Sequence, residues 1–248
     1  MPGELYSIAL VNYLNAKPFL YGLQNGPDLP VKFDVTLFNP ADCALAFLEG
    51  KADMALVPVG SLPELKDYKI ITDYGIAALE EVRTVCLFSN SEHRDWKEVF
   101  LDNHSRTSVL LAQLLIKNVL GIQPTYSKID AENFHPASGQ AILLIGDKVF
   151  ARENEFTYSY DLAKLWFDWT GLPFVFAVWV GKNDIPEHIT SHLNTLLHYG
   201  TSRLEEVIKE NGTDPNLLRE YYHRYIQYRL DENHHRGLLH FLDLIKKV

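Results

Sequence analysis

The sequence predicts an α/β protein with a mainly parallel sheet, because short apolar runs alternate with helical patterns along most of its 248 residues. The runs over 8–11 and 141–145 are continuously apolar, as is typical of strands that are buried on both faces. Several helical stretches end at a glycine, such as Gly50 and Gly121, which can end a helix in the left-handed conformation. These three observations favour repeated strand–helix–strand units.

The expected elements fall into two series and a helical end. In the first series, strands are expected over 8–11, 31–38, 54–57 and from 70 onward, with helical segments over 18–23 and 40–49. In the second, strands are expected over 85–88, 99–101, 141–145 and 172–180, with helices over 106–120 and 161–170. In the last third, Asp214 before Pro215 signals the start of one helix, and another begins around Asp231.

Two arrangements fit this order of elements. One is a single long sheet. The other has two lobes, with the chain crossing over near 80–84 and returning near 172–180, which would place a ligand cleft between the lobes at the ends of strands. Periodicity is compatible with both arrangements.

Composition excludes some classes of partner. The formal net charge is −9, from 23 Lys and Arg against 32 Asp and Glu, whereas a nucleic-acid or anionic-membrane surface needs a basic face. A small anion stays possible as a ligand, since a few buried donors set the local potential. The start of the chain has no basic and apolar signal-peptide pattern, and no run of about 18 apolar residues could span a membrane. Cys43 and Cys86 are expected to be buried, reduced thiols, and the expected compartment is the cytoplasm.

The most suggestive local feature is the polar run Ser105, Arg106, Thr107 and Ser108, which lies between a strand and an apolar helix. The first turn of a helix has backbone N–H groups without partners in the helix, and the helix dipole favours an anion there. Three hydroxyls and a guanidinium would add further donors for a carboxylate. The alternative is that Ser105 only caps the helix while Arg106 points into solvent.

Five further residues are candidates, and all of them except Thr84 lie at or just after the end of a strand. Asn15 follows the first strand, and its amide could bind a ligand or serve as an N-cap or Asx turn. Val59 belongs to a strand-to-helix turn that could offer backbone N–H groups. Gly146 and Asp147 end an apolar strand, where Asp147 could orient a ligand hydroxyl or cap the next segment. Thr84 is polar in an apolar context, and such a threonine is usually a strand residue facing solvent.

Patterns that indicate other chemistries are absent. The sequence has no CxxC pair, G-x-S-x-G elbow, P-loop or G-x-G-x-x-G fingerprint. His188 and His192 have the spacing of a metal pair, but no HExxH pattern surrounds them and a solvated helix face is the expected explanation. Nucleotide, flavin, zinc and serine-hydrolase functions therefore lose their usual support.

Five segments, in order, resemble the MqnA family, the chorismate dehydratases of the futalosine route to menaquinone. They are Val-Asn-Tyr-Leu-Asn-Ala-Lys-Pro-Phe at 11–19, Ala-Asp-Met-Ala-Leu-Val-Pro at 52–58, Ser-Arg-Thr-Ser at 105–108, Leu-Ile-Gly-Asp at 144–147 and Trp-Thr-Gly-Leu-Pro-Phe-Val-Phe-Ala at 169–177. The related dihydroxynaphthoate synthases open with a Ser-Pro-Cys-Pro-Asn-Asp-Thr-like motif that this chain lacks.

The resemblance implies a periplasmic-binding-protein-like fold of type 2, with two α/β lobes around a ligand cleft and a helical C-terminal segment. Together with the crossover segments it predicts one lobe of residues 1–82 plus 178–248, including the C-terminal helices, and a second lobe of 83–177. It implies loss of water from the dianion chorismate to give 3-[(1-carboxyvinyl)oxy]benzoate, with no metal or organic cofactor and no nucleic-acid or membrane partner. Oligomeric state stays open.

The resemblance also assigns roles to the candidate residues. It implies that Asn15 is the central active-site amide and that Ser105 to Ser108 cradle a carboxylate. Thr84, with serine at its position in some relatives, would be a catalytic cleft hydroxyl. Val59, Gly146 and Asp147, from their places at strand ends, are also predicted to bind the substrate. The family is proposed to use the substrate's side-chain carboxylate as the base. Two alternatives stay open: a non-catalytic binding or sensor protein for a small carboxylate, and the 1,4-dihydroxy-6-naphthoate synthase.

Overall fold

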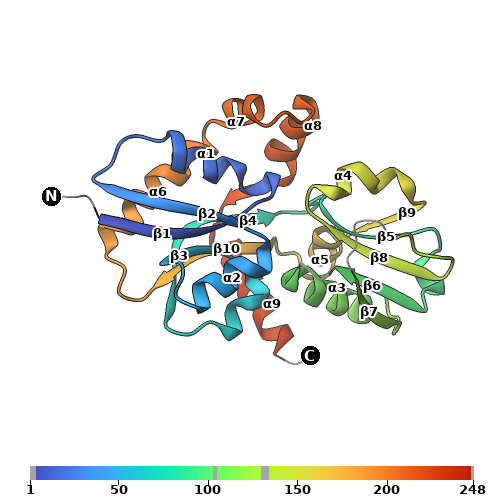
Figure 1. Ribbon diagram of the computed structural model, residues 1–248. Coiled ribbons are helices and arrows are strands. Elements are labelled where there is room, and N and C mark those ends of the chain that lie inside the picture. Colours follow the sequence, from blue (N-terminus) through green and yellow to red (C-terminus); the bar gives the residue numbers. More distant parts are fainter. Residues whose placement is uncertain (1–3, 103–104, 130–133, 247–248) are drawn as a thin grey trace. The chain divides into compact units, whose positions relative to one another are not determined.

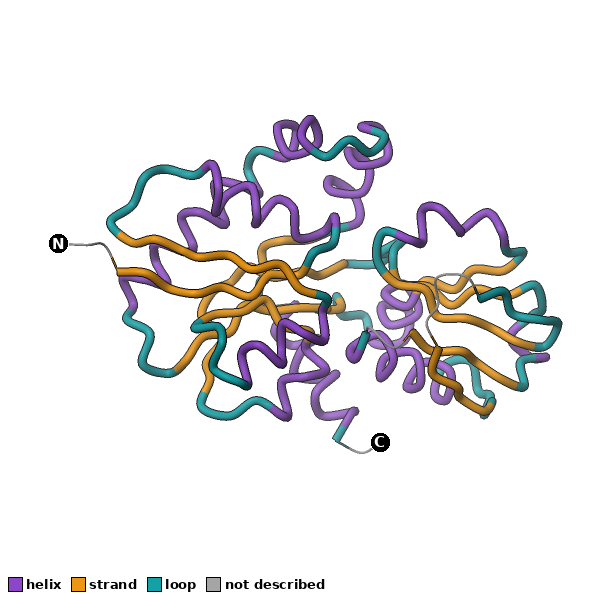
Figure 2. The backbone as a smooth tube through the Cα atoms, viewed as in Figure 1, coloured by secondary structure: helices purple, strands orange, loops and turns teal. Residues whose placement is uncertain are grey.

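The computed structural model describes residues 4–102, 105–129 and 134–246 and divides the chain into two units, each with its own sheet (Figures 1 and 2). Unit 1 comprises Met1–Ile76 and Ala177–Asp231, and unit 2 comprises Ala77–Phe176 and Glu232–Val248. The two-sheet arrangement is therefore the one adopted. None of the helices in the described ranges is long and apolar enough to cross a membrane.

The described part of unit 1 contains a six-stranded sheet in the order β11-β4-β10-β3-β1-β2. Its strands are β1 (Glu4–Val11), β2 (Val31–Phe38), β3 (Met54–Pro58), β4 (Tyr68–Ala78), β10 (Phe174–Lys182) and β11 (Gln227–Arg229). Strand β1 pairs in parallel with β2 and β3, whereas β10 runs antiparallel to β3. The sheet is mixed rather than mainly parallel, because β10 is the strand along which the chain returns to unit 1.

The helices of unit 1 cover both faces of this sheet. They are α1 (Lys17–Asn25), α2 (Pro40–Leu48), α6 (Glu187–Thr201), α7 (Leu204–Glu210) and α8 (Pro215–Glu220), with the 3-10 turns η1 (Leu14–Ala16) and η2 (Val59–Glu64) and the π-helical turn η5 (Tyr221–Tyr225). The chain steps from β1 to β2 in one direction and from β2 back past β1 to β3 in the other. Right-handed crossovers therefore place α1 and α2 on opposite faces, as Figure 1 shows.

Helices α1 and α6 cross with their backbones in contact. A Cβ atom built on Gly200 would lie 1.8 Å from the carbonyl oxygen of Pro18, and one built on Gly22 would lie 2.0 Å from that of Leu196. Both glycines are buried at the crossing. Only glycine permits this approach, which fixes α1 and hence the loop that precedes it.

The described part of unit 2 contains a five-stranded sheet in the order β7-β6-β8-β5-β9. Its strands are β5 (Val85–Ser89), β6 (Glu98–Asp102), β7 (Thr125–Ile129), β8 (Gln140–Ile145) and β9 (Tyr158–Asp161), and its helices are α3 (Arg106–Asn118), α4 (Lys148–Arg152), α5 (Leu162–Thr170) and α9 (Glu232–Ile245). The strand β6 is parallel to β7 and β8, and β5 is antiparallel to β8 and β9, so this sheet is also mixed. Cys86, Phe88 and Val149 belong to one buried cluster between the sheet and α4.

The last helix, α9, belongs to unit 2, whereas the predicted boundaries placed residues 178–248 with the first lobe. Phe241 packs against Trp166 of α5 and Phe174, with ring centroids 6.2 and 5.0 Å apart. Gly237 allows close packing, since a Cβ atom there would lie 2.2 Å from the carbonyl oxygen of Pro173. A helix starting around Asp231 was predicted correctly, since α9 begins at Glu232, but its packing partner lies about 65 residues earlier in the chain, beyond the reach of periodicity.

The two cysteines are buried and free, as predicted. Cys43 lies in α2 and Cys86 in β5. Burial raises the pKa of Cys43 to about 12 and raises that of Cys86 well above its ordinary value, so both thiols stay protonated at neutral pH. Neither is a reactive thiolate.

The glycine crossing gives a direct test of unit 1. Gly200→Ala should lower the free energy of unfolding by about 1–3 kcal/mol, because the added methyl group meets backbone that cannot move aside, despite the better helix propensity of alanine. Urea denaturation followed by circular dichroism measures the change. Ser191→Ala, on the exposed side of the same helix, is the control and should change the free energy by no more than about 0.5 kcal/mol. Equal stability of both variants would contradict the close crossing.

Candidate active site

The candidate residues of unit 2 gather at one edge of its sheet. Strands β6 and β8 are parallel, so their carboxyl ends lie at the same edge, and the antiparallel pairing of Val85 with Ile145 brings the beginning of β5 there as well. This edge therefore carries Thr84, the turn at Gly146 and the start of α3. The N–H of Gly146 donates to the carbonyl oxygen of Thr84 at 2.8 Å, which joins two of the three segments.

The start of α3 combines capping with buried hydroxyls. Ser105 is the N-cap, and its Oγ accepts a hydrogen bond from the N–H of Ser108 at 3.1 Å. Thr107 is buried and its hydroxyl donates to the carbonyl oxygen of Phe176 at 3.4 Å, while Arg106 is exposed. The Ser108 hydroxyl has no hydrogen-bond partner among the described residues, although its side chain is 4% exposed. The neighbouring Asn103 and His104 lie outside the described residues.

The capping alternative for Ser105 is thus correct, and it is compatible with the predicted anion site. A hydroxyl that accepts from a backbone N–H keeps its own proton to donate. The helix has 13 residues, so its dipole favours a negative charge at this end. An anion here would meet the Ser105 and Ser108 hydroxyls, and the exposed residue Arg106 lies between them in sequence.

Thr84 is held in place by the crossover segment before it. Thr84 is 1% exposed, so the expectation that such a threonine faces solvent is wrong. Its predecessor Arg83 has a φ of 65°, a conformation that non-glycine residues rarely adopt. The N–H groups of Val82 and Arg83 donate to one oxygen of Asp161, at 3.0 and 2.6 Å, and this contact stabilises the turn.

Asp161 connects the crossover to α5. Its second oxygen accepts from the N–H groups of Ala163 and Lys164, at 2.9 and 3.1 Å, which caps that helix. Burial raises the pKa of Asp161 to about 6, whereas the four N–H donors act in the opposite direction. The carboxylate serves the fold, because all four of these donors come from the protein's own backbone.

The turn after β8 contains a left-handed glycine and an unexpected lysine contact. Gly146 has a φ of 69°. Asp147 occupies the N-cap position of α4 but its side chain makes no capping hydrogen bond, so the capping alternative is not observed. The next residue, Lys148, donates from Nζ to Oδ2 of Asp102, the last residue of β6, whose side chain is completely buried. Sequence reasoning missed this pair, since nothing local links residues 102 and 148.

The candidate residues of unit 1 lie at the carboxyl edge of its own sheet. The parallel pairing of β1 with β3 and β2 brings together the ends of these strands, after which η1 carries Asn15 and η2 begins at Val59. The Val59 side chain is fully buried, so its contribution to a site would come from the backbone. This edge of the sheet therefore carries the side-chain amide of Asn15 and the buried turn that begins at Val59.

Asn15 has neither of the structural roles considered for it from sequence. The N-cap of η1 is Tyr13 and that of α1 is Ala16, and neither makes a side-chain cap. The Asn15 side chain is partly buried, and no described residue forms a hydrogen bond with it. A side-chain amide without a partner at a strand end is suited to bind a ligand.

The turn that carries Asn15 is held by the C-terminal third of the chain. The hydroxyl of Tyr222, in the π-helical turn η5, donates to the carbonyl oxygen of Leu14 at 2.9 Å, and Tyr222 is 1% exposed. On the other side, Lys17 Nζ donates to Oδ1 of Asn12 at 3.1 Å. In the sequence, Tyr222 follows Leu218 at helical spacing, and only the fold reveals its contact with residue 14.

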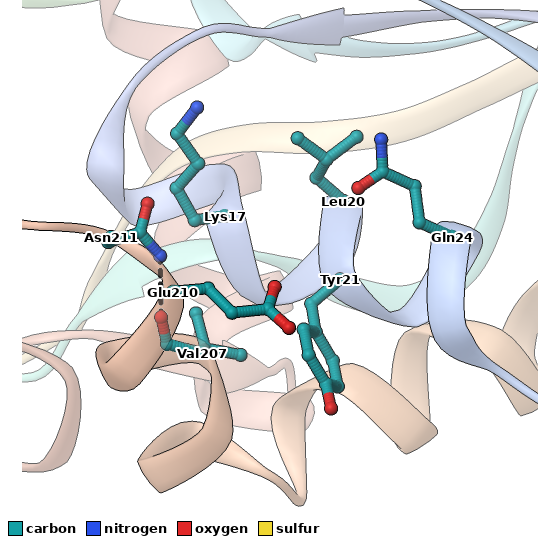
Figure 3. Close-up of a pocket in the computed structure, with 7 residues that line it drawn as sticks. All are labelled: Lys17, Leu20, Tyr21, Gln24, Val207, Glu210 and Asn211. Atoms are coloured by element: carbon teal, nitrogen blue, oxygen red, sulfur yellow. Dashed lines mark hydrogen bonds between the residues drawn. The ribbon is translucent and has the colours of Figure 1, made fainter.

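A pocket of about 180 Å³ lies in unit 1 between α1 and α7 (Figure 3). Its lining mixes polar and apolar side chains: Lys17, Leu20, Tyr21, Gln24, Val207, Glu210 and Asn211. None of the predicted site residues lines it. We therefore do not assign the candidate site to this pocket.

Comparison with solved structures identifies the fold. A protein of Archaeoglobus fulgidus aligns with a TM-score of 0.78 and 13% identity, covering 98% of this chain and 97% of that one. A Candida albicans protein with the generic periplasmic binding protein fold aligns with a TM-score of 0.69 and 8% identity, covering 100% and 91%. The alkanesulfonate-binding protein SsuA of Xanthomonas axonopodis aligns with a TM-score of 0.63 and 16% identity, covering 100% and 94%. The periplasmic-binding-protein-like fold predicted from the resemblance is confirmed.

Sequence comparison identifies the family. The chain is 28% identical to the chorismate dehydratase of Thermus thermophilus, over 97% of this chain and 95% of that protein. Residues 6–247 match the family described as Menaquinone biosynthesis, which is nearly the whole chain. The ordered segments at 11–19, 52–58, 105–108, 144–147 and 169–177 all lie within that match, and the predicted resemblance is confirmed. The protein belongs to the menaquinone biosynthesis family.

Proposed function

We propose that this protein is a chorismate dehydratase, which removes water from chorismate to give 3-[(1-carboxyvinyl)oxy]benzoate on a route to menaquinone. The nearly full-length similarity to the dehydratase of Thermus thermophilus carries this proposal. The start of α3 supports it, because hydroxyls at a helix N-terminus suit the carboxylates of a dianionic substrate. A cytoplasmic location remains our prediction for a biosynthetic enzyme of this kind.

The reaction makes modest demands on the protein, because the product ring is aromatic. A ring proton passes to a base, its electron pair completes the aromatic system as the C4–O bond breaks, and the departing hydroxide takes up a proton to leave as water. The proposed side chains are mostly amide, hydroxyl and guanidinium groups, which orient the substrate and stabilise developing charge. We assign removal of the proton to the substrate's own side-chain carboxylate.

Each proposed residue has one task. Ser105 to Ser108 hold a substrate carboxylate at the start of α3, and Asn15, with Thr84, stabilises the charge that forms as the proton leaves. Val59 and Gly146 contribute backbone at the two sheet edges, and Asp147 orients a substrate hydroxyl.

Purified protein mixed with chorismate should generate a new benzoate absorbance in the ultraviolet, and mass spectrometry should show that the product is chorismate minus one water. A sensor or binding protein would instead be stabilised thermally by chorismate without forming a product. A naphthoate synthase would neither bind nor convert it. Either of these results would overturn the proposed function.

Kinetics of two variants test the division of tasks. Asn15→Ala should lower kcat about 100-fold or more with a small change in KM, because its amide acts on charge that develops in the transition state. Arg106→Ala should chiefly raise KM, about tenfold, because its guanidinium contributes to holding an anion in ground and transition states alike. Steady-state rates with chorismate measure both parameters. The reverse pattern would refute the assignment.

Tyr222→Phe tests whether the C-terminal third positions Asn15. Loss of the hydrogen bond to Leu14 should lower kcat about 3- to 30-fold, while KM changes little. The hydrogen bond contributes about 1 kcal/mol, and its loss would also displace the Asn15 amide from its working position. Tyr225→Phe is the matched control in the same turn, since its hydroxyl donates to Glu220 at 3.3 Å and should not affect kcat. Equal kcat values for the two variants would argue against a positioning role.

A further inference from the structure

We propose that Lys148 and Asp102 form a charge pair that makes the carboxyl edge of unit 2 able to accept an anion, an inference that rests on the proposed function. Asp102 is the last residue of β6 and its carboxylate has no exposed surface. Lys148 is the first residue of α4, and its side chain is 21% exposed. Its ammonium group donates to the buried carboxylate.

The pair lies directly beside the proposed anion cradle. Asp102 precedes the α3 N-cap by three residues, and its carbonyl oxygen accepts a hydrogen bond from the N–H of Ser105 at 3.4 Å. The pairing of Phe100 with Ile142 brings Asp102, two residues later, level with the carboxyl end of β8, where Lys148 follows. Both members of the pair therefore belong to the segments that form the edge.

A buried carboxylate beside the start of α3 would repel the carboxylate of a bound substrate unless its negative charge is neutralised. Asp102 is buried, so water screens its charge poorly, and its hydrogen bond to the N–H of Ser105 places it next to the start of α3, where a substrate carboxylate would bind. Lys148 cancels that charge. Because Lys148 is partly exposed and Asp102 is not, the ammonium group is the more accessible end of this neutral pair for an approaching dianion.

A merely structural pair would behave differently from an electrostatic one. A structural pair joins the turn after β8 to the end of β6, so removing either partner, or both, would disturb the edge in the same way. An electrostatic pair predicts opposite effects of the two single changes, because one leaves an extra negative charge and the other an extra positive charge. A double-mutant cycle separates these cases.

The experiment measures kcat and KM for chorismate at low salt for the wild type, Lys148→Met, Asp102→Asn and the double variant. Lys148→Met should raise KM about 10- to 50-fold, from repulsion between unscreened like charges. Asp102→Asn should lower KM below that of the wild type, and the double variant should return to within about threefold of it. Lys164→Met is the matched control, because Lys164 pairs with Asp168 on the exposed surface of α5 in the same unit.

Several results would overturn the inference. One is an unchanged KM in Lys148→Met, and another is a KM in the double variant as high as in that single variant. If Lys148→Met does not fold, Asp102→Asn alone decides, and an unchanged or raised KM in it is contrary to the proposal. A wild type that does not convert chorismate overturns the proposed function and this inference together. An active wild type whose variants do not show the predicted changes in KM overturns the inference alone.

Discussion

Parallel pairing of strands is the constraint on which the candidate site depends. In unit 2, β6 and β8 run in the same direction, so the turns that follow them lie at one edge, and the antiparallel β5 begins there. In unit 1, β1 and β3 do the same for the turns that carry Asn15 and Val59. Ligands of open α/β sheets bind at such edges because the chain emerges there with polar groups and helix N-termini.

Polar groups at the edge of unit 2 divide into those that hold the fold and those that remain for a ligand. Asp161 accepts four backbone N–H groups and Thr107 donates to Phe176, so both stabilise the segments around them. By contrast, Ser108 has no side-chain partner within the described ranges. Helices of this kind can thus be capped and still bind an anion, since capping uses one lone pair of Ser105 and leaves its proton.

The C-terminal third of the chain supports both units. Its π-helical turn places Tyr222 against the carbonyl oxygen of Leu14 in unit 1, and α9 packs through Phe241 against Trp166 and Phe174 in unit 2. Such π-helical turns are uncommon and often occur at functional sites. Here the turn places the buried hydroxyl of Tyr222 against Leu14, the neighbour of the proposed catalytic residue Asn15.

The sequence alone determined the α/β class, most strand and helix positions, the buried thiols, the family and a set of candidate residues at strand ends. These properties follow from local periodicity, glycine and proline signals, and ordered motifs. Only the tertiary structure decided that the sheets are mixed, that α9 belongs to unit 2, and that Thr84 is buried. It also revealed the contacts of Lys148 with Asp102 and of Tyr222 with Leu14. These pairs are 46 and 208 residues apart in sequence, and no local pattern encodes a contact that strand order and packing create.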